Sequence, residues 1–512
     1  MLKFQNSYKS LPLCLYTDAR PAVFPKSKVL LFNTDLAAEF DDTQLLNKEL
    51  DMLLNDLQFG TQEYIDSPIC LSYAGHQFGH FVPLLGDGRA HLLGEWRNKE
   101  GNLRDIQLKG SGKSPYSRGG DGLATLSSMI REYVVSEAMC GLRIPTSRSL
   151  ALISSGETVF RGQEEPGGIL IRVAQSHVRV GTLERLAHLN CLKELEQLLD
   201  MVITRHYSSF WIDTPEKIEM FLQAWMKKQI DLVVEWLGVG FIHGVMNTDN
   251  TTLSGETLDF GPCAFLDEYE HYKVFSAIDS FGRYAYGNQG NSLFWNFQRL
   301  LDSLRILIPK NDLDWNDFTE KCLSDFKSYF NQCFFKKFGS KIGIFDFNTD
   351  YSQKRIRDLL FIMEKNKLDF TVTFKSLEWH LRTLLTQEIG NPWENSPNPP
   401  AVSLADLFQI SDGLKEWVLL WRHQLDLADA KVVNPEKLKK HIDLMSLANP
   451  SLIPRNHLVE KYIKECVEKN ELAGLKKWME ALKNPYCMDN IDLAWVTPPE
   501  DSQKVKQTHC GT

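Results

Sequence analysis

The sequence lacks several features that would assign the chain to a familiar class at once. No uninterrupted apolar run approaches the roughly 20 residues that a membrane helix needs, and the N-terminal MLKFQNSYKSLPLCLYTDARP contains no apolar core adequate for a secretory signal. The ten cysteines include no C-x-x-C pair, which argues against a zinc site or a disulfide framework and favours reduced thiols. We therefore expect a cytoplasmic protein that does not span a membrane.

An excess of positive charge is also missing. The chain has 57 Lys and Arg against 66 Asp and Glu, so its formal net charge is -9. A general nucleic-acid binder depends on neutralising backbone phosphates, and this balance argues against one. The remaining composition is ordinary for a folded protein: 512 residues, 43% hydrophobic and 24% charged, without an internal repeat or a low-complexity segment. That length allows about two to four compact units.

The most informative stretch is FIHGVMNTDNTTLSGETLDFG, residues 241–261. A short apolar approach leads into a turn-rich loop with Asn247, Asp249 and Asn250, and the stretch ends in Asp259-Phe260-Gly261. Asp and Asn oxygens are the hard ligands that Mg²⁺ and Mn²⁺ prefer, and such a metal completes its shell with water and phosphate oxygens. Phosphoryl or nucleotidyl transfer is therefore the first hypothesis. The alternative is a structural hairpin, because these residues also form turns by bonding their own backbone.

A glycine-rich, aromatic segment, SYAGHQFGHFVPLLGDGRAHLLGEW, precedes this loop by more than a hundred residues. It predicts a strand-turn-strand lid with a strand over 91–96, and we expect its tightest turn at Gly86-Asp87-Gly88-Arg89. Missing side chains there would let backbone N–H groups approach a phosphate, and Arg89 would add charge. A plain hairpin turn with an exposed Arg is the alternative. The neighbouring glycines argue against the helix that His76 and His80 would need to bind zinc as a pair.

A lysine, a glycine loop and a helix follow in that order. The segment GSGKS is not a P-loop, because that motif needs glycine where the chain has Gln107. What remains is Lys109 at the end of an alternating strand, followed by a helix expected over 123–141 that contains Glu132. Protein kinases use a strand Lys and a helix Glu in this way to hold a Lys on nucleotide phosphates. A surface Lys and a surface Glu are the alternative for each residue alone.

Two arginines follow in a region, 144–180, that predicts strands around a turn at 164–168. Arg172 and Arg179 are seven residues apart, so on one regular strand their side chains would face opposite ways. A bend or a helix start between them is needed before both can reach one anion, and solvated arginines are the alternative. Further on, 182–238 predicts two helices, and the Pro- and Asn-rich run NPWENSPNPP at 391–400 predicts a domain boundary.

Several of these motifs together carry a resemblance to a known family. With GHQFGHF, LKGSGKSPYSRGGDG, IREYVVSEAM, HGVMNTDN, LDFGPCAFLD and MSLANPSLIPRNH in this order, the chain closely resembles the selenoprotein O/YdiU family of protein adenylyltransferases over nearly its whole length. The resemblance implies an α+β, bilobal protein-kinase-like fold with a β-rich N-lobe and a helical C-lobe. The implied parts are an N-terminal extension at 1–62, the nucleotide-binding N-lobe at 63–181, the C-lobe with its catalytic loop at 182–390 and a C-terminal helical region at 401–512.

The resemblance also implies a reaction: transfer of AMP from ATP to a Ser, Thr or Tyr hydroxyl of an acceptor protein, or of the chain itself, with ATP bound in reversed orientation and Mg²⁺ or Mn²⁺ as the metal. Asp249 matches the family's proposed base, and Asn250 and Asp259 match its metal ligands. The implied nucleotide-site residues are Gly86, Gly88, Arg89, Lys109, Asp121, Gly122, Glu132 as the partner of Lys109, Arg172, Arg179 and Asp259.

Two other functions stay open on the residues alone, namely an ordinary protein kinase and an inactive pseudokinase that binds nucleotide as a scaffold. The chain departs from an ordinary kinase because His243-Gly244-Val245 stands where a kinase has His-Arg-Asp, and Asp249 directly precedes Asn250. Some family members have selenocysteine near the C-terminus, where this chain has only Cys510. Whether that thiol has a redox role stays open.

Overall fold

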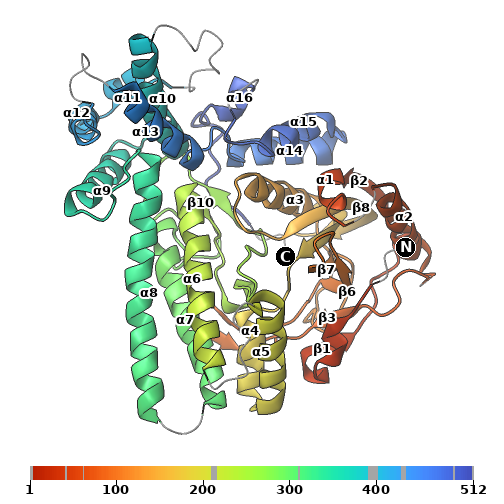
Figure 1. Cartoon of the computed structure of the whole chain (residues 1–512). Helices are drawn as coiled ribbons and strands as arrows, with labels where there is room; N and C mark the ends of the chain where they lie inside the picture. Colours follow the sequence, from red (N-terminus) through yellow and green to blue (C-terminus); the bar gives the residue numbers. More distant parts are fainter. Residues whose placement is uncertain are drawn as a thin grey trace.

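The computed structural model describes residues 4–40, 43–61, 63–208, 216–308, 312–389, 402–427, 434–487 and 491–509. The boundary expected at 391–400 and Cys510 lie outside these ranges. The fold is of mixed α+β type, with an antiparallel sheet in the N-terminal part followed by a largely helical remainder (Figure 1). Within the described ranges, no helix combines the length and apolar character that crossing a membrane requires.

The N-terminal part is built on one seven-stranded antiparallel sheet with the strand order β1-β3-β6-β7-β9-β8-β2. Residues 1–62 contribute both edge strands, β1 and β2, so this segment completes the sheet. The strands of the sheet are β1 (Tyr16–Asp18), β2 (Lys28–Phe32), β3 (Ile69–Leu71), β6 (Ala90–Arg97), β7 (Leu103–Lys109), β8 (Arg148–Phe160) and β9 (Glu164–Ala174). Two small pairs lie apart from it: β4 (Gly75–Gln77) with β5 (His80–Val82), and β10 (Phe241–Ile242) with β11 (Ala264–Phe265).

Alternation along the central strand β7 separates a core face from a polar face. Ile106 and Leu108 belong to the apolar cluster that also contains Leu53 and Leu57 of helix α2 (Thr43–Phe59). The intervening Gln107 lies opposite Arg172 of β9 on the other face. Helix α3 (Leu126–Gly141) packs against β8 and β9, and so the sheet's polar side chains can meet those of α3.

The part of the chain that follows the sheet is largely helical. The described residues of 180–238 form three helices, where the sequence predicted two. Helices α6, α7 and α8 pack along one another (Figure 1), and α14 and α15 pack back onto α3. Besides α3, the described α-helices are α1 (Thr34–Ala37), α2 (Thr43–Phe59), α4 (Val180–His188), α5 (Leu192–His206), α6 (Lys217–Gly238), α7 (Gln289–Leu304), α8 (Asp312–Lys341), α9 (Asp350–Lys365), α10 (Phe370–Ile389), α11 (Leu404–Ile410), α12 (Leu414–Gln424), α13 (Pro435–Ala448), α14 (Asn456–Lys469), α15 (Ala473–Leu482) and α16 (Leu493–Val496).

One hairpin turn differs from its predicted place. The β8–β9 hairpin turns at 161–163, around Gly162 with φ +81°, whereas 164–168 continues as strand β9. That prediction was wrong about which glycine turns the chain. In the lid, a turn is confirmed at Gly88 and Arg89, directly before β6, and Gly86 has a positive φ. A second turn, at Phe78 and Gly79, both with positive φ, joins β4 to β5.

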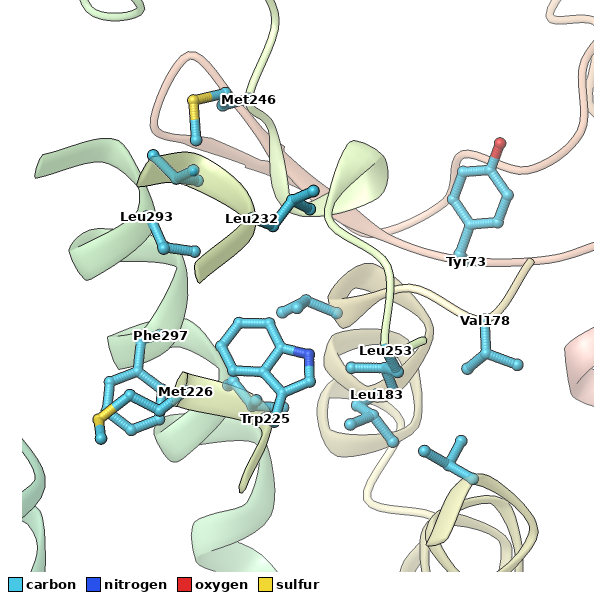
Figure 2. Close-up of a cluster of buried hydrophobic side chains, with 14 of the residues drawn as sticks. Tyr73, Val178, Leu183, Trp225, Met226, Leu232, Met246, Leu253, Leu293 and Phe297 are labelled. Carbon is cyan, nitrogen blue, oxygen red and sulfur yellow. The ribbon is translucent and has the colours of Figure 1, made fainter. Parts of the chain in front are cut away.

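The largest apolar core lies beneath the loop that the sequence analysis singled out. Met246 precedes and Leu253 follows the segment that contains Asn247, Asp249 and Asn250. Figure 2 shows both side chains among side chains from α4, α6 and α7. Trp225 of α6 donates its indole N–H to the carbonyl oxygen of Thr252 at 3.1 Å, and Gln229 donates to the same oxygen at 2.7 Å. The core therefore anchors both ends of the loop.

Candidate active site

The loop and the sheet face each other across one cavity of about 430 Å³. Its walls come from the lid segment, the end of β7, the glycine-rich loop, β9, the residue before α4 and the loop that contains Asn247, Asp249 and Asn250. The predicted site residues that line it are Gly86, Gly88, Arg89, Lys109, Asp121, Gly122, Arg172, Arg179, Asp249, Asn250 and Asp259. Six of its lining side chains are cationic and four are acidic, and this balance favours an anionic ligand.

Behind this cavity lies a buried network of charges. Lys109 Nζ donates to Glu132 Oε2 at 2.6 Å and also contacts Asp259. Arg172 donates Nε to Glu132 Oε1 at 2.8 Å, and one of its terminal nitrogens lies 3.6 Å from Asp259 Oδ1. Burial would raise the pKa of Asp259, but Lys109 and Arg172 outweigh it and hold that pKa below its usual range. Glu132 is thus a shared anchor for two cations, and Asp259 stays ionised.

Asp249 has a different environment. It lies in a short 3₁₀ turn, Thr248–Asn250, and is only 8% exposed. Burial raises its pKa to about 6, although the charge of Arg179 opposes the shift. Gln77 donates Nε2–H to Oδ2 at 3.3 Å, while Oδ1 has no hydrogen-bond partner among the described residues. A buried carboxylate with an unpartnered oxygen and a raised pKa is suited to accept a proton.

Asn250 and Asp259 are suited to hold a divalent cation. The Asn250 amide nitrogen donates to the carbonyl oxygen of Val245 at 3.0 Å, which leaves the amide oxygen as its ligand atom. Both side chains line the same cavity and offer the oxygen ligands that Mg²⁺ or Mn²⁺ takes. No group of three or more His, Cys, Asp or Glu side chains in the described ranges could hold a metal alone. A cation here would therefore share its shell with phosphate oxygens.

Arg179 lies beyond the bend that the sequence analysis required. Strand β9 ends at Ala174, and Arg179 is the residue before helix α4, so Arg172 and Arg179 both line the cavity. The guanidinium carbon of Arg179 lies 4.2 Å from the ring centroid of Tyr73, and a terminal nitrogen lies 3.6 Å from Asp87 Oδ1. Its buried Nε has no partner among the residues described. A buried guanidinium beside a helix N-terminus favours an anion.

The glycine-rich loop is closed at its base by close backbone packing. Gly112 N–H donates to the Gly122 carbonyl at 3.1 Å, and a Cβ on Gly122, whose φ is +71°, would lie 2.1 Å from the Gly112 oxygen. Arg161 holds both carboxylate oxygens of Asp121, at 2.7 and 2.8 Å, and this pairing lowers the Asp121 pKa to about 2. The loop thus joins the β8–β9 hairpin turn at the mouth of the cavity.

Sequence reasoning gave no site role to several residues that line the cavity, among them Tyr73, Gln77, Asp87 and Arg161. Asp87 accepts from the backbone N–H of Leu71 and from Gln107 Nε2, both at 3.1 Å, and so supports the start of the lid. Gln77 lies in the motif GHQFGHF and Asp87 in the predicted turn, but neither pattern identifies the partner of the side chain. Tyr73 and Arg161 have no local signal, because their partners lie elsewhere in the chain.

Comparisons with known proteins show the family to which the chain belongs. The sequence profile of the family described as Protein adenylyltransferase SelO matches residues 1–483. The chain is 41% identical to "Protein nucleotidyltransferase YdiU" of Bacillus cereus (strain ATCC 10987 / NRS 248), over 99% of this chain and 98% of the relative. It is also 41% identical to the protein of the same name from Clostridium perfringens (strain 13 / Type A), over 99% of this chain and 97% of the relative. The chain therefore belongs to the SelO/YdiU family of protein adenylyltransferases and is a nucleotidyltransferase enzyme.

Proposed function

We propose that this chain transfers AMP from ATP to Ser, Thr or Tyr hydroxyls of acceptor proteins, and that ATP lies in the cavity with its terminal phosphates inward. The fold would then be protein-kinase-like and bilobal, with lobes at 63–181 and 182–390, an extension at 1–62 and a helical region at 401–512. We also propose that the protein is cytoplasmic, as expected from the sequence. The observation that carries the proposal is that buried cations and a buried carboxylate with an unpartnered oxygen line one cavity.

The depth of the cations supports the inward orientation of the phosphates. Lys109, Arg172 and Arg179 are 4%, 3% and 5% exposed, respectively, whereas Arg89 is more exposed at the lid. Guanidinium groups bind phosphate oxygens strongly, because they offer paired donors and a charge that does not titrate. The terminal phosphates would thus meet the most deeply buried positive charges, and the α-phosphate would lie nearer the acceptor.

The reaction then follows from the residues present. Asp249 receives the proton of the acceptor hydroxyl, whose oxygen forms a bond to the α-phosphorus as the bond from that phosphorus to the bridging oxygen breaks. Pyrophosphate leaves, and Lys109, Arg172 and Arg179 hold its charge. A Mg²⁺ or Mn²⁺ ion held by Asn250 and Asp259 would supply charge neutralisation of the phosphate oxygens. Glu132 keeps Lys109 and Arg172 in place throughout.

Two alternatives use the same cavity, namely phosphate transfer by an ordinary kinase and nucleotide binding without catalysis. The test is incubation of the purified chain with ATP and Mg²⁺ or Mn²⁺, alone and with candidate acceptors, followed by intact mass. Gain of an adenylyl group that Asp259→Ala abolishes is the expected result. Gain of a phosphoryl group would establish the kinase instead. Thermal stabilisation by ATP without any mass gain on chain or acceptors would favour the scaffold.

A further inference from the structure

The β4–β5 hairpin lies directly on the catalytic loop. The backbone N–H of His76 donates to Thr248 Oγ1 at 2.7 Å, and the backbone N–H of Phe78 donates to Asn247 Oδ1 at 3.1 Å. Glu184 of α4 ties the two together, since its carboxylate accepts from Thr248 Oγ1 at 2.5 Å and lies 2.6 Å from His76 Nδ1. These bonds join segments that are far apart in the chain, so the hairpin is a fixed wall of the site.

Between these bonds, the hairpin meets the Asp249 carboxylate itself. A Cβ on Gly75 would lie 2.7 Å from Asp249 Oδ1, so the backbone of β4 packs against that side chain. Two residues further on, Gln77 donates to Oδ2 at 3.3 Å. Gln77 also lines the cavity, whereas its register partner His80 on β5 is exposed and does not line it.

The two oxygens of Asp249 are therefore unequal. Oδ2 accepts a hydrogen bond from the hairpin, and Oδ1 has no partner in the described part of the chain. A carboxylate rotates easily about its terminal torsion, which is broad for Asp. The Gln77 donor on Oδ2 and the Gly75 backbone against the buried Oδ1 together set that torsion, so they fix the plane of the carboxylate.

We propose that Gln77 is a positioning residue for the transfer reaction: its amide holds Asp249 Oδ2 and so fixes the plane of the carboxylate that receives the proton of the acceptor hydroxyl. This inference rests on the proposed function, in which Asp249 accepts the proton. It assigns to the lid hairpin a role in orienting the base, in addition to its place beside the nucleotide. Loss of the amide donor leaves the nucleotide's cationic contacts unchanged but lets the carboxylate turn, so the chemical step slows more than nucleotide binding weakens.

The test uses Gln77→Met, which keeps the length of the side chain and removes the donor, and Gln77→Glu, which replaces the donor with an acceptor. His80→Gln on the facing strand is the matched control. For each variant, kcat and the KM for ATP are measured separately, with an acceptor or self-modification as the readout.

We expect kcat to fall about 10- to 100-fold in both Gln77 variants, with less than about a 3-fold change in KM, as for loss of a transition-state interaction. His80→Gln should match the unmodified chain. A kcat within about 2-fold of the unmodified chain in Gln77→Met would overturn the proposal, as would a fall in kcat matched by an equal rise in KM.

A second measurement does not depend on activity. Gln77→Met, Asp249→Ala and the double variant are compared in thermal unfolding without nucleotide. If Gln77 contacts Asp249, their Tm changes fail to add by more than about 1 °C, because residues that share a hydrogen bond are coupled. Additive changes would refute the contact whether or not the chain transfers AMP. If the changes are coupled but the unmodified chain transfers a phosphoryl group, the contact stands and the proposed function fails.

Discussion

Asp249→Asn should abolish transfer and at the same time stabilise the folded chain. The substitution keeps the shape of the side chain and removes a charge that is buried at 8% exposure with one oxygen unpartnered. Burial raises the pKa of Asp249 from 3.8 to about 6. At a pH well above 6, that shift corresponds to about 3 kcal/mol of lost folding free energy, at about 1.36 kcal/mol per pKa unit. The site thus keeps a charged base at the expense of stability.

The sign of the pH dependence follows from the direction of the shift. Below the unfolded-state pKa of 3.8, the carboxyl is protonated in both states and its charge has no effect on stability. Between 3.8 and about 6, the unfolded chain ionises first, so the cost grows as the pH rises. Above about 6, the cost is complete. The advantage of Asp249→Asn should therefore be small, below about 1 kcal/mol, near pH 4, and reach its full size above pH 7.

Thermal unfolding in EDTA without nucleotide measures this difference. For a chain of this length, about 3 kcal/mol corresponds to a rise in Tm of about 3 °C. Asp105→Asn is the matched control, because Asp105 is also buried but its pKa is lowered to about 2. Burial opposes that shift, and the charge of Arg205 and the hydrogen bond from His177 outweigh it. That variant should be less stable than the unmodified chain at pH 7. A Tm for Asp249→Asn that is unchanged at pH 8, or raised equally at pH 4 and pH 8, would refute the reasoning.

Three further outcomes test the surroundings of the base. Glu132→Gln leaves two buried cations without their shared carboxylate, so the free energy of unfolding in urea should fall by about 3 to 5 kcal/mol; an unchanged midpoint would contradict the network. Gly122→Ala places a Cβ 2.1 Å from the Gly112 oxygen at a residue whose φ is +71°, which should cause a strain of about 1 to 3 kcal/mol. The control is Gly119→Ala, because Gly119 also has a positive φ, +87°, but a Cβ there would meet nothing within 4 Å. The KM for ATP should be well above that of the control in Gly122→Ala. Equal values for the two would show that closure of the loop is unimportant. EDTA should abolish transfer and excess Mg²⁺ or Mn²⁺ should restore it; transfer that persists in EDTA would contradict the metal role of Asp259.

Much of the local structure was predictable from the sequence, because it depends on local patterns. The strand that ends at Lys109 and the helix that contains Glu132 are confirmed, the latter beginning at Leu126, three residues later than expected. The bend between Arg172 and Arg179 is confirmed as well, since opposite strand faces required it. In contrast, the position of a turn depends on which of several glycines adopts positive φ, and the pattern of glycines alone does not decide that.

The contacts that shape the site were not predictable in this way. Gln77 and Asp249 are 172 residues apart, and nothing in either local sequence pairs them. The reason that they meet is visible only in the packing, where two glycines leave room for the base. A Cβ on Gly181 at the start of α4 would lie 2.1 Å from the Ala74 carbonyl oxygen, and one on Gly75 would collide with Asp249 itself. Gly75 lies in a motif of the family and Gly181 lies outside those motifs, and their shared purpose, to let the hairpin and α4 close around one carboxylate, depends on the folded chain.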